Sequence, residues 1–201
     1  MSLESIWDKR LQVRTIGRDE ENADQYRYPY EPTPYCVLER LVKSCLIGEN
    51  DVVLDYGCGK GRVDFFLSDQ TQANTIGVEY DERIYQTAIE NQKTAISRAR
   101  TEFVLARAEN HRVSLNVTCC YFFNPFSVEI LHKVLARILE SYYENPRRIL
   151  LFFYYPSEEY LSYLMTVDEL EVCDEIPCGD LFETKSARER IVIFSLPGYD
   201  L

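Results

Sequence analysis

A short apolar stretch that runs directly into a cluster of glycines is the feature of this sequence that most restricts how the chain can fold. The stretch covers 51–55, the glycines are Gly57, Gly59 and Gly61, and a helical pattern begins at Arg62. Residues without a Cβ let the backbone bend sharply and leave room for a ligand. The first amides of the following helix face that room. The pattern therefore predicts a strand, a ligand-binding turn and a helix.

An acidic residue, Glu79, closes the next predicted strand, 18 positions after Gly61. In nucleotide-binding α/β folds, a carboxylate about 20 residues beyond the glycine turn accepts the ribose hydroxyls. The turn here has the spacing GxGxG, whereas dinucleotide sites have GxGxxG. A nicotinamide-dependent oxidoreductase is disfavoured for this reason, and the turn and the acid together predict a nucleoside site.

Apolar periodicity places strands and helices in alternation along most of the chain. Helices are expected near 35–45, at 62–70 and 82–99, from Ser127 through Leu139, and at 158–165. Strands are expected at 51–55, 74–79, 102–106, 117–123, 148–155, 170–176 and 190–195. Alternation of this kind implies parallel pairing with helices on both faces of the sheet. The last two strands lack an intervening helix and should form a hairpin, which leaves one strand antiparallel. The expected fold class is α/β, a three-layer sandwich around a mostly parallel seven-stranded sheet.

The 201 residues suffice for one buried core, so we expect a single domain, with an N-terminal helical extension at 1–48 and a core at 49–201. The formal net charge of −11 argues against tight nonspecific binding to a phosphate backbone. Seven cysteines without a CxxC pair make a zinc site or a disulfide framework improbable. We expect neither a membrane span nor a secretory signal, and therefore a cytoplasmic protein.

The segment DYGCGKGRV, with Glu79 at the end of the next strand, resembles the class I (Rossmann-like) S-adenosylmethionine (SAM) dependent methyltransferases. The resemblance covers Asp51 to Tyr155, and the terminal hairpin fits the seven-stranded sheet of that family. It implies that Asp55 and the turn glycines lie beneath the methionine part of SAM and that Glu79 holds the ribose. In the segment ARAEN, Arg107 takes the place of the acid expected beside adenine, so that Glu109 or Asn110 substitutes for it.

The segment FFNPF follows the fourth large strand, at the sheet edge where ligands bind in open parallel sheets. It resembles the tetrad of amine methyltransferases, which carries Asn or Asp, two prolines and an aromatic; this chain has a single proline. The resemblance implies that Asn124 orients the acceptor nitrogen and that Phe126 forms a pocket wall. A second interpretation stays open, in which Asn124 caps the following helix and Phe126 belongs to the core.

The predicted site residues fall into two groups. The predicted catalytic group is Asn124, Pro125 and Phe126. The predicted cofactor-binding group is Asp55, Tyr56, Gly57, Cys58, Gly59, Gly61, Glu79, Tyr80, Ala108, Glu109 and Asn124. No metal is expected. Four tyrosines near the N-terminus either cover the cofactor or pack an N-terminal segment across the sheet, and they are Tyr26, Tyr28, Tyr30 and Tyr35.

These residues predict a methyltransferase that uses SAM and acts on a nitrogen of a protein or small molecule. Two alternatives stay open. One is an RNA N-methyltransferase, for which a local basic patch at Arg98, Arg100, Arg107 and Arg112 is the available feature. The other is a SAM-binding protein without catalysis. Composition and motifs do not name the acceptor.

Overall fold

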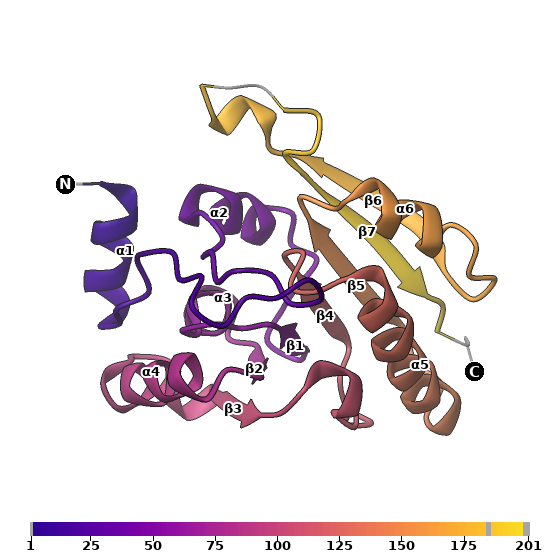
Figure 1. Ribbon diagram of the computed structural model, residues 1–201, viewed down its shortest axis with the longest axis horizontal. Helices are drawn as coiled ribbons and strands as arrows, with labels where there is room; N and C mark the ends of the chain where they lie inside the picture. The colour runs from indigo at the N-terminus through magenta and orange to yellow at the C-terminus, as the bar shows by residue number, and fades with distance from the viewer. Residues whose placement is uncertain (1, 184–185, 199–201) are drawn as a thin grey trace.

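A seven-stranded sheet with the order β3-β2-β1-β4-β5-β7-β6 forms the centre of the molecule in the computed structural model (Figure 1). The structure describes residues 2–183 and 186–198. The strands are β1 (Val52–Tyr56), β2 (Asn74–Glu79), β3 (Thr101–Leu105), β4 (Cys119–Phe122), β5 (Ile149–Tyr154), β6 (Glu171–Pro177) and β7 (Arg190–Leu196).

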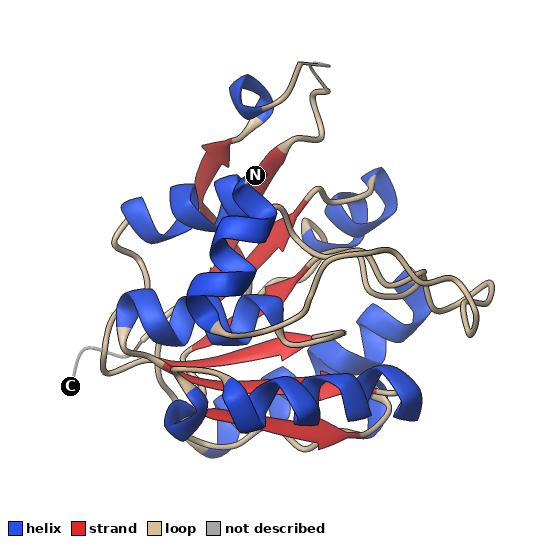
Figure 2. Ribbon diagram, turned by 90° about the vertical axis from the view of Figure 1, so that its left-hand side faces the viewer, coloured by secondary structure: helices blue, strands red, loops and turns tan. Residues whose placement is uncertain are grey.

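Helices cover both faces of this sheet, as Figure 2 shows. The α-helices are α1 (Leu3–Leu11), α2 (Tyr35–Lys43), α3 (Arg62–Thr71), α4 (Glu82–Thr94), α5 (Val128–Glu144) and α6 (Glu158–Leu164). Three short 3-10 helices are η1 (Arg98–Arg100), η2 (Ala108–Asn110) and η3 (Gly179–Leu181). Apolar residues of α1 to α4 share one core cluster, and those of α5 and α6 share another on the opposite face. The three-layer sandwich predicted from the alternating pattern is confirmed.

Strand directions follow the prediction. Strands β1 to β5 pair in parallel, whereas β7 is antiparallel to both β5 and β6. Every residue of β1, β4 and β5 is buried, which is what a central strand covered by helices on both faces requires. The parallel strands all end at one edge, and this edge carries the glycine turn, Glu79 and the Asn-Pro-Phe segment.

Helix α4 is shorter than its sequence pattern predicts, because it ends at Thr94 rather than near residue 99. Beyond it, the amide of Ile96 donates to the carbonyl of Leu11 at 3.2 Å, and Ala95 is extended. The hydrogen bond to the end of α1 thus uses the backbone at the point where α4 would have continued. This contact between distant parts of the chain ends the helix, although the apolar periodicity of the sequence continues.

The segment between α1 and α2, residues 12–34, crosses the carboxyl ends of the strands, and we call it the strap. In Figure 1 it is the dark indigo coil that leaves α1 and returns to α2. It forms an isolated antiparallel bridge from Arg27 to Phe126. Within residues 2–183 and 186–198, no helix is long and apolar enough to cross a membrane.

Candidate active site

The glycine turn after β1 is held in left-handed backbone conformations, with φ +73° at Gly57 and +57° at Gly59. A Cβ built on Gly57 would lie 2.5 Å from the Cβ of Pro125, and one on Gly59 would lie 2.1 Å from the ring of Tyr30. Both the backbone angle and the close approach therefore exclude a side chain. The turn brings the strap and the Asn-Pro-Phe segment into direct contact with the end of β1.

Glu79 lies against this turn, as the sequence predicts. Its Oε2 accepts from the amide of Gly59 at 3.0 Å, and its Oε1 accepts from the amides of Tyr80 and Asp81 at 2.8 and 2.9 Å. The side chain is buried, and burial raises the pKa of the Glu79 carboxyl, while the three amide hydrogen bonds act in the opposite direction. A carboxylate fixed in this way keeps lone pairs free for the hydroxyls of a ligand.

A cavity that is partly open to solvent lies between the strap and the ends of β1, β2 and β4. The room enclosed beneath the strap is about 80 Å³, and with the open space at its mouth included it reaches about 920 Å³. Apolar walls come from Val63, Val78, Ile84, Ala106, Phe123 and Ile130. Charged groups converge from Asp55 at the end of β1, Glu79 at the end of β2, and Arg62 at the start of α3. The arrangement suits a ligand with an apolar planar part, hydroxyl groups and a charged end.

Nine of the thirteen predicted site residues line this cavity. They are Asp55, Gly57, Cys58, Glu79, Tyr80, Ala108, Glu109, Pro125 and Phe126. The other four do not line it. Gly59 and Gly61 form the turn beneath the strap, and Tyr56 and Asn124 point elsewhere.

Tyr56 faces the opposite side of the sheet from Asp55, because neighbouring residues of a strand alternate. Its ring stacks on that of Phe122 at a centroid distance of 5.0 Å and belongs to the core beneath α5. Its hydroxyl is buried and has no hydrogen-bond partner among the residues that the structure describes.

The Asn-Pro-Phe segment is fixed by contacts on all sides. Asn124 has a φ of +40°, and its Nδ2 donates to the carbonyl of Tyr155 at 2.5 Å. Its Oδ1 is buried without a partner within residues 2–183 and 186–198. The side chain therefore does not cap α5, whose N-cap residue is Ser127. Phe126 is 4% exposed; it belongs to the core and also lines the cavity.

The strap roofs the cavity. Asp19 forms an ion pair with Arg83 at 2.7 Å, and the Nδ2 of Asn22 donates to Asp81 at 2.8 Å. Residues 26–28 are tied at two further places. The amide of Tyr28 donates to the carbonyl of Pro125 at 3.2 Å, and the amide of Ser127 donates to the carbonyl of Tyr26 at 2.8 Å. At the other place Arg27 forms an ion pair of 2.9 Å with Glu109, each side chain being 14% exposed. The predicted adenine-side acid thus contacts the strap.

Of the four N-terminal tyrosines, some lie where a cover over the cofactor would lie and others do not. Tyr28 and Tyr30 line the cavity, and Tyr30 also donates its hydroxyl to the carbonyl of Thr15 at 2.6 Å. Tyr35 is fully buried in the core at the start of α2, and Tyr26 is largely exposed. Only the middle two are placed where a cover over a ligand would be.

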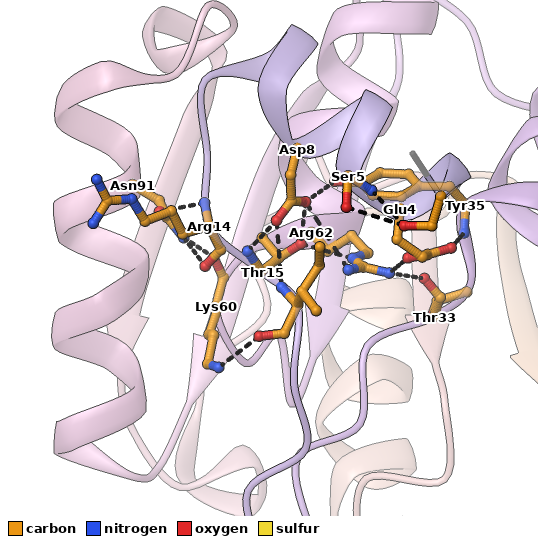
Figure 3. Close-up of polar contacts among 12 residues, drawn as sticks. Glu4, Ser5, Asp8, Arg14, Thr15, Thr33, Tyr35, Lys60, Arg62 and Asn91 are labelled. Carbon is orange, nitrogen blue, oxygen red and sulfur yellow. Dashed lines mark hydrogen bonds and ion pairs between the residues drawn. The ribbon is translucent and has the colours of Figure 1, made fainter.

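Both ends of the strap are tied to Arg62, the first residue of α3 (Figure 3). Its Nε donates to the hydroxyl of Thr15 at 2.7 Å, and its Nη1 donates to the carbonyl of Thr33 at 3.2 Å and to Glu4. The hydroxyl of Thr15 in turn donates to Asp8 at 2.6 Å. This guanidinium is 3% exposed, so a buried cation holds α1, the strap and the glycine turn together.

Arg62 and Arg27 are the site residues that the sequence interpretation missed. Arg62 follows the last glycine directly, at a position where an arginine is usually counted as a solvent-exposed helix start. The sequence gives no signal for its role, because the unbroken burial from Arg62 to Ser68 is visible only in the structure. Arg27 offered no sequence signal, because its partner lies 82 positions away.

Comparisons with known proteins agree with this geometry. No protein-family model matches the chain. A protein-lysine N-methyltransferase from Saccharolobus islandicus (strain REY15A) is 34% identical over 71 residues, which are 34% of this chain and 44% of that protein. The chain therefore matches less than half the length of this curated relative.

Solved structures match over most of the chain. An RNA methyltransferase from Salinibacter ruber, in complex with S-adenosyl-L-homocysteine, has a TM-score of 0.54 at 19% identity, covering 83% of this chain and 94% of that one. A TehB-like SAM-dependent methyltransferase from Corynebacterium glutamicum has a TM-score of 0.57 at 18% identity, and the match covers 80% of this chain and 88% of that one. An rRNA methylase from Streptococcus thermophilus has a TM-score of 0.56 at 14% identity, and the match covers 84% of this chain and 99% of that one. These likenesses establish the fold.

Proposed function

We propose that this chain, whose fold is that of the class I SAM-dependent methyltransferases, binds SAM in the cavity under the strap and transfers its methyl group to a nitrogen. The observation that carries the proposal is the contact between Glu79 and the amide of Gly59 at 3.0 Å. It joins the predicted ribose acid to the predicted cofactor turn at one wall of the cavity. The local match to a protein-lysine N-methyltransferase supports the same conclusion.

The residues around the cavity fit each part of this cofactor. Glu79 is a buried carboxylate with capacity for ribose hydroxyls, and Asp55 presents a second buried carboxyl beside Gly57. The apolar side chains of Val78, Ile84 and Ala108 offer a surface for the adenine ring. When bound, SAM supplies an electrophilic methyl group on a positively charged sulfur.

The chain's own contribution is positioning and exclusion of water. The strap covers the cavity, and Phe126 and Pro125 form the wall next to the glycine turn. Transfer to a nitrogen needs an in-line approach, for which a fixed geometry is the main requirement. The unpaired Oδ1 of Asn124 is an acceptor at the end of β4. We propose that it takes an N–H of the acceptor once the Asn-Pro-Phe segment adjusts to the bound substrate.

We favour an amine of a protein or small molecule as the acceptor. The net charge of −11 suits a cationic substrate better than a phosphate backbone. RNA is the second candidate, because two of the structural neighbours are an RNA methyltransferase and an rRNA methylase. The absence of a long apolar helix from the described residues is consistent with the cytoplasm, which we retain as a proposal.

Calorimetric titration with S-adenosylhomocysteine tests the cofactor assignment. We expect binding by the wild type and a loss of about tenfold to a hundredfold in Glu79→Gln, the range for a hydrogen bond to a charged group. Glu102→Gln on β3 is the matched control, because this glutamate is exposed and does not line the cavity. No binding by the wild type, or equal binding by Glu79→Gln, contradicts the proposal.

A transfer assay then separates the acceptor classes. Wild-type protein is incubated with SAM labelled on the methyl group and with protein, small-molecule and RNA fractions of a cell extract. We expect label in a protein or small-molecule fraction. Label in RNA favours the second candidate, and binding of S-adenosylhomocysteine without transfer to any fraction favours a non-catalytic SAM-binding protein.

A further inference from the structure

Asp64 is a fully buried acid in the first turn of α3, with 0% exposure. Neither of its carboxyl oxygens has an N–H or O–H donor within hydrogen-bond distance in the part of the chain that the structure describes. A carboxylate left in this state costs several kcal/mol, so buried acids without donors hold a proton instead. Asp64 has no role in the methyl transfer proposed for the cavity.

The carboxyl group that acts on Asp64 is that of Asp55 on β1. Asp55 is 3% exposed and lines the cavity, while its Oδ2 is buried and also lacks a donor among the described residues. The other titratable groups that interact with this pair are Glu79 on β2, Cys58 in the turn and Tyr121 on β4, and none of them is cationic. Arg62 lines the same cavity, but its guanidinium is bound to Thr15 and Glu4.

We propose that Asp64 keeps its proton at neutral pH and donates it in a hydrogen bond to Asp55, which holds Asp55 as the anion that receives the ammonium group of the cofactor's methionine part. This inference rests on the proposed function for its ligand, but not for the state of the two acids. Asp64 acts through Asp55 and is a positioning residue, since it does not line the cavity.

The electrostatics of the pair support this division of roles. Burial raises the pKa of Asp64 well above its ordinary value, and the charge of Asp55 raises it further. Burial also raises the pKa of Asp55, and the charge of Glu79 adds to this. A proton held by Asp64 and donated to Asp55 would lower the pKa of Asp55, so that Asp64 retains the proton that the two acids share.

Infrared spectroscopy tests the protonation state without any ligand. At pH 7.5 the wild type is expected to show the carbonyl stretch of a protonated carboxylic acid, and the difference spectrum between the wild type and Asp64→Asn is expected to contain this band. The asparagine has nearly the same shape and still offers an N–H donor. A wild-type spectrum without this band, or a difference spectrum without it, overturns the inference, even if cofactor binding is confirmed.

Binding of S-adenosylhomocysteine between pH 6 and 8 tests the link to the ligand. Because burial raises the pKa of Asp55, its ionised fraction and hence the wild-type affinity should rise with pH over this range. Asp64→Asn should bind within about threefold of the wild type at pH 7, because it keeps a donor. Asp64→Leu should bind about tenfold more weakly, with its midpoint shifted to higher pH.

5′-Methylthioadenosine, which lacks the amino-acid part, is the matched control ligand. Its affinity should not change between the wild type and Asp64→Leu, which also shows that the leucine variant is folded. If Asp64→Leu does not fold, the affinities of Asp64→Asn and the wild type, measured over the same pH range, still test the inference. Equal affinity and an equal midpoint for all three proteins, or an equal loss for both ligands, overturns the inference. Failure of the wild type to bind either ligand contradicts the proposed function instead.

Discussion

Replacement of Gly59 by alanine offers the most direct test of how the strap sits on the glycine turn. The new Cβ would lie 2.1 and 2.2 Å from two ring atoms of Tyr30, and the backbone has a φ of +57°. A left-handed conformation costs a residue with a Cβ about 1–2 kcal/mol, and overpacking adds about 1–3 kcal/mol. We expect Gly59→Ala to lower the free energy of unfolding by about 2–5 kcal/mol, as the sum of these two effects.

A double-mutant cycle separates the two costs. In a Tyr30→Ala background the ring is gone, so Gly59→Ala should cost only the conformational part, about 1–2 kcal/mol. Gly17→Ala is a control for backbone strain alone, because Gly17 has a φ of +106° and its nearest neighbour would be the Lys60 Nζ at 3.9 Å. Urea unfolding of the four proteins of the cycle measures the coupling. An equal cost of Gly59→Ala in both backgrounds would show that the ring does not lie over the turn.

Four further expectations follow from the same contacts. Arg62→Met should lower the free energy of unfolding by about 3–5 kcal/mol in urea titrations, because it leaves the buried Asp8 and the half-buried Glu4 without their cation; a loss below 1 kcal/mol would contradict the central role of Arg62. Arg27→Gln should speed proteolysis within the strap, whereas Arg18→Gln, in a pair whose side chains are 58% and 65% exposed, should not. Asn124→Ala should abolish labelled methyl transfer while S-adenosylhomocysteine still binds in calorimetry, since Asn124 does not line the cavity. The raised pKa of Asp64 means that its stabilising contribution is lost as pH rises through that pKa. The melting temperature of Asp64→Asn minus that of the wild type should therefore be higher at pH 8 than at pH 5.

The sheet and its ligand-binding edge could be predicted because their signals are local. An apolar stretch, three glycines and an acid 18 residues later predict two neighbouring strands, with the glycine turn at the end of one and Glu79 at the end of the other. Strand alternation would also have separated Asp55 from Tyr56, since adjacent strand residues face opposite sides of a sheet. Treating the whole DYGCG segment as cofactor-binding overlooked this simple consequence, and Tyr56 indeed lies in the opposite core.

The strap and its anchors could not be predicted because their partners are distant in sequence. The contact of Arg27 with Glu109 spans 82 positions, and that of Arg62 with Thr15 spans 47. No periodicity records such pairs, and the strap itself has almost no regular structure. The role of the Asn-Pro-Phe segment was likewise predicted from resemblance alone. The orientation of Asn124 depends on its hydrogen bond to the carbonyl of Tyr155, just after the neighbouring strand β5.

The anchors of the strap also differ among themselves, and the difference indicates where it would open. Its two ends are held by a guanidinium that is 3% exposed, through the Thr15 hydroxyl and the Thr33 carbonyl. Its middle is held by two backbone hydrogen bonds, by the pair of Arg27 and Glu109, and by contacts of Asp19 and Asn22 with Arg83, Asp81 and Tyr80. These contacts are more numerous than those at the ends, but their side chains are more exposed than the Arg62 guanidinium. Local opening begins where contacts are least buried. We therefore expect the middle to open before the ends, which would uncover the carbonyl of Pro125.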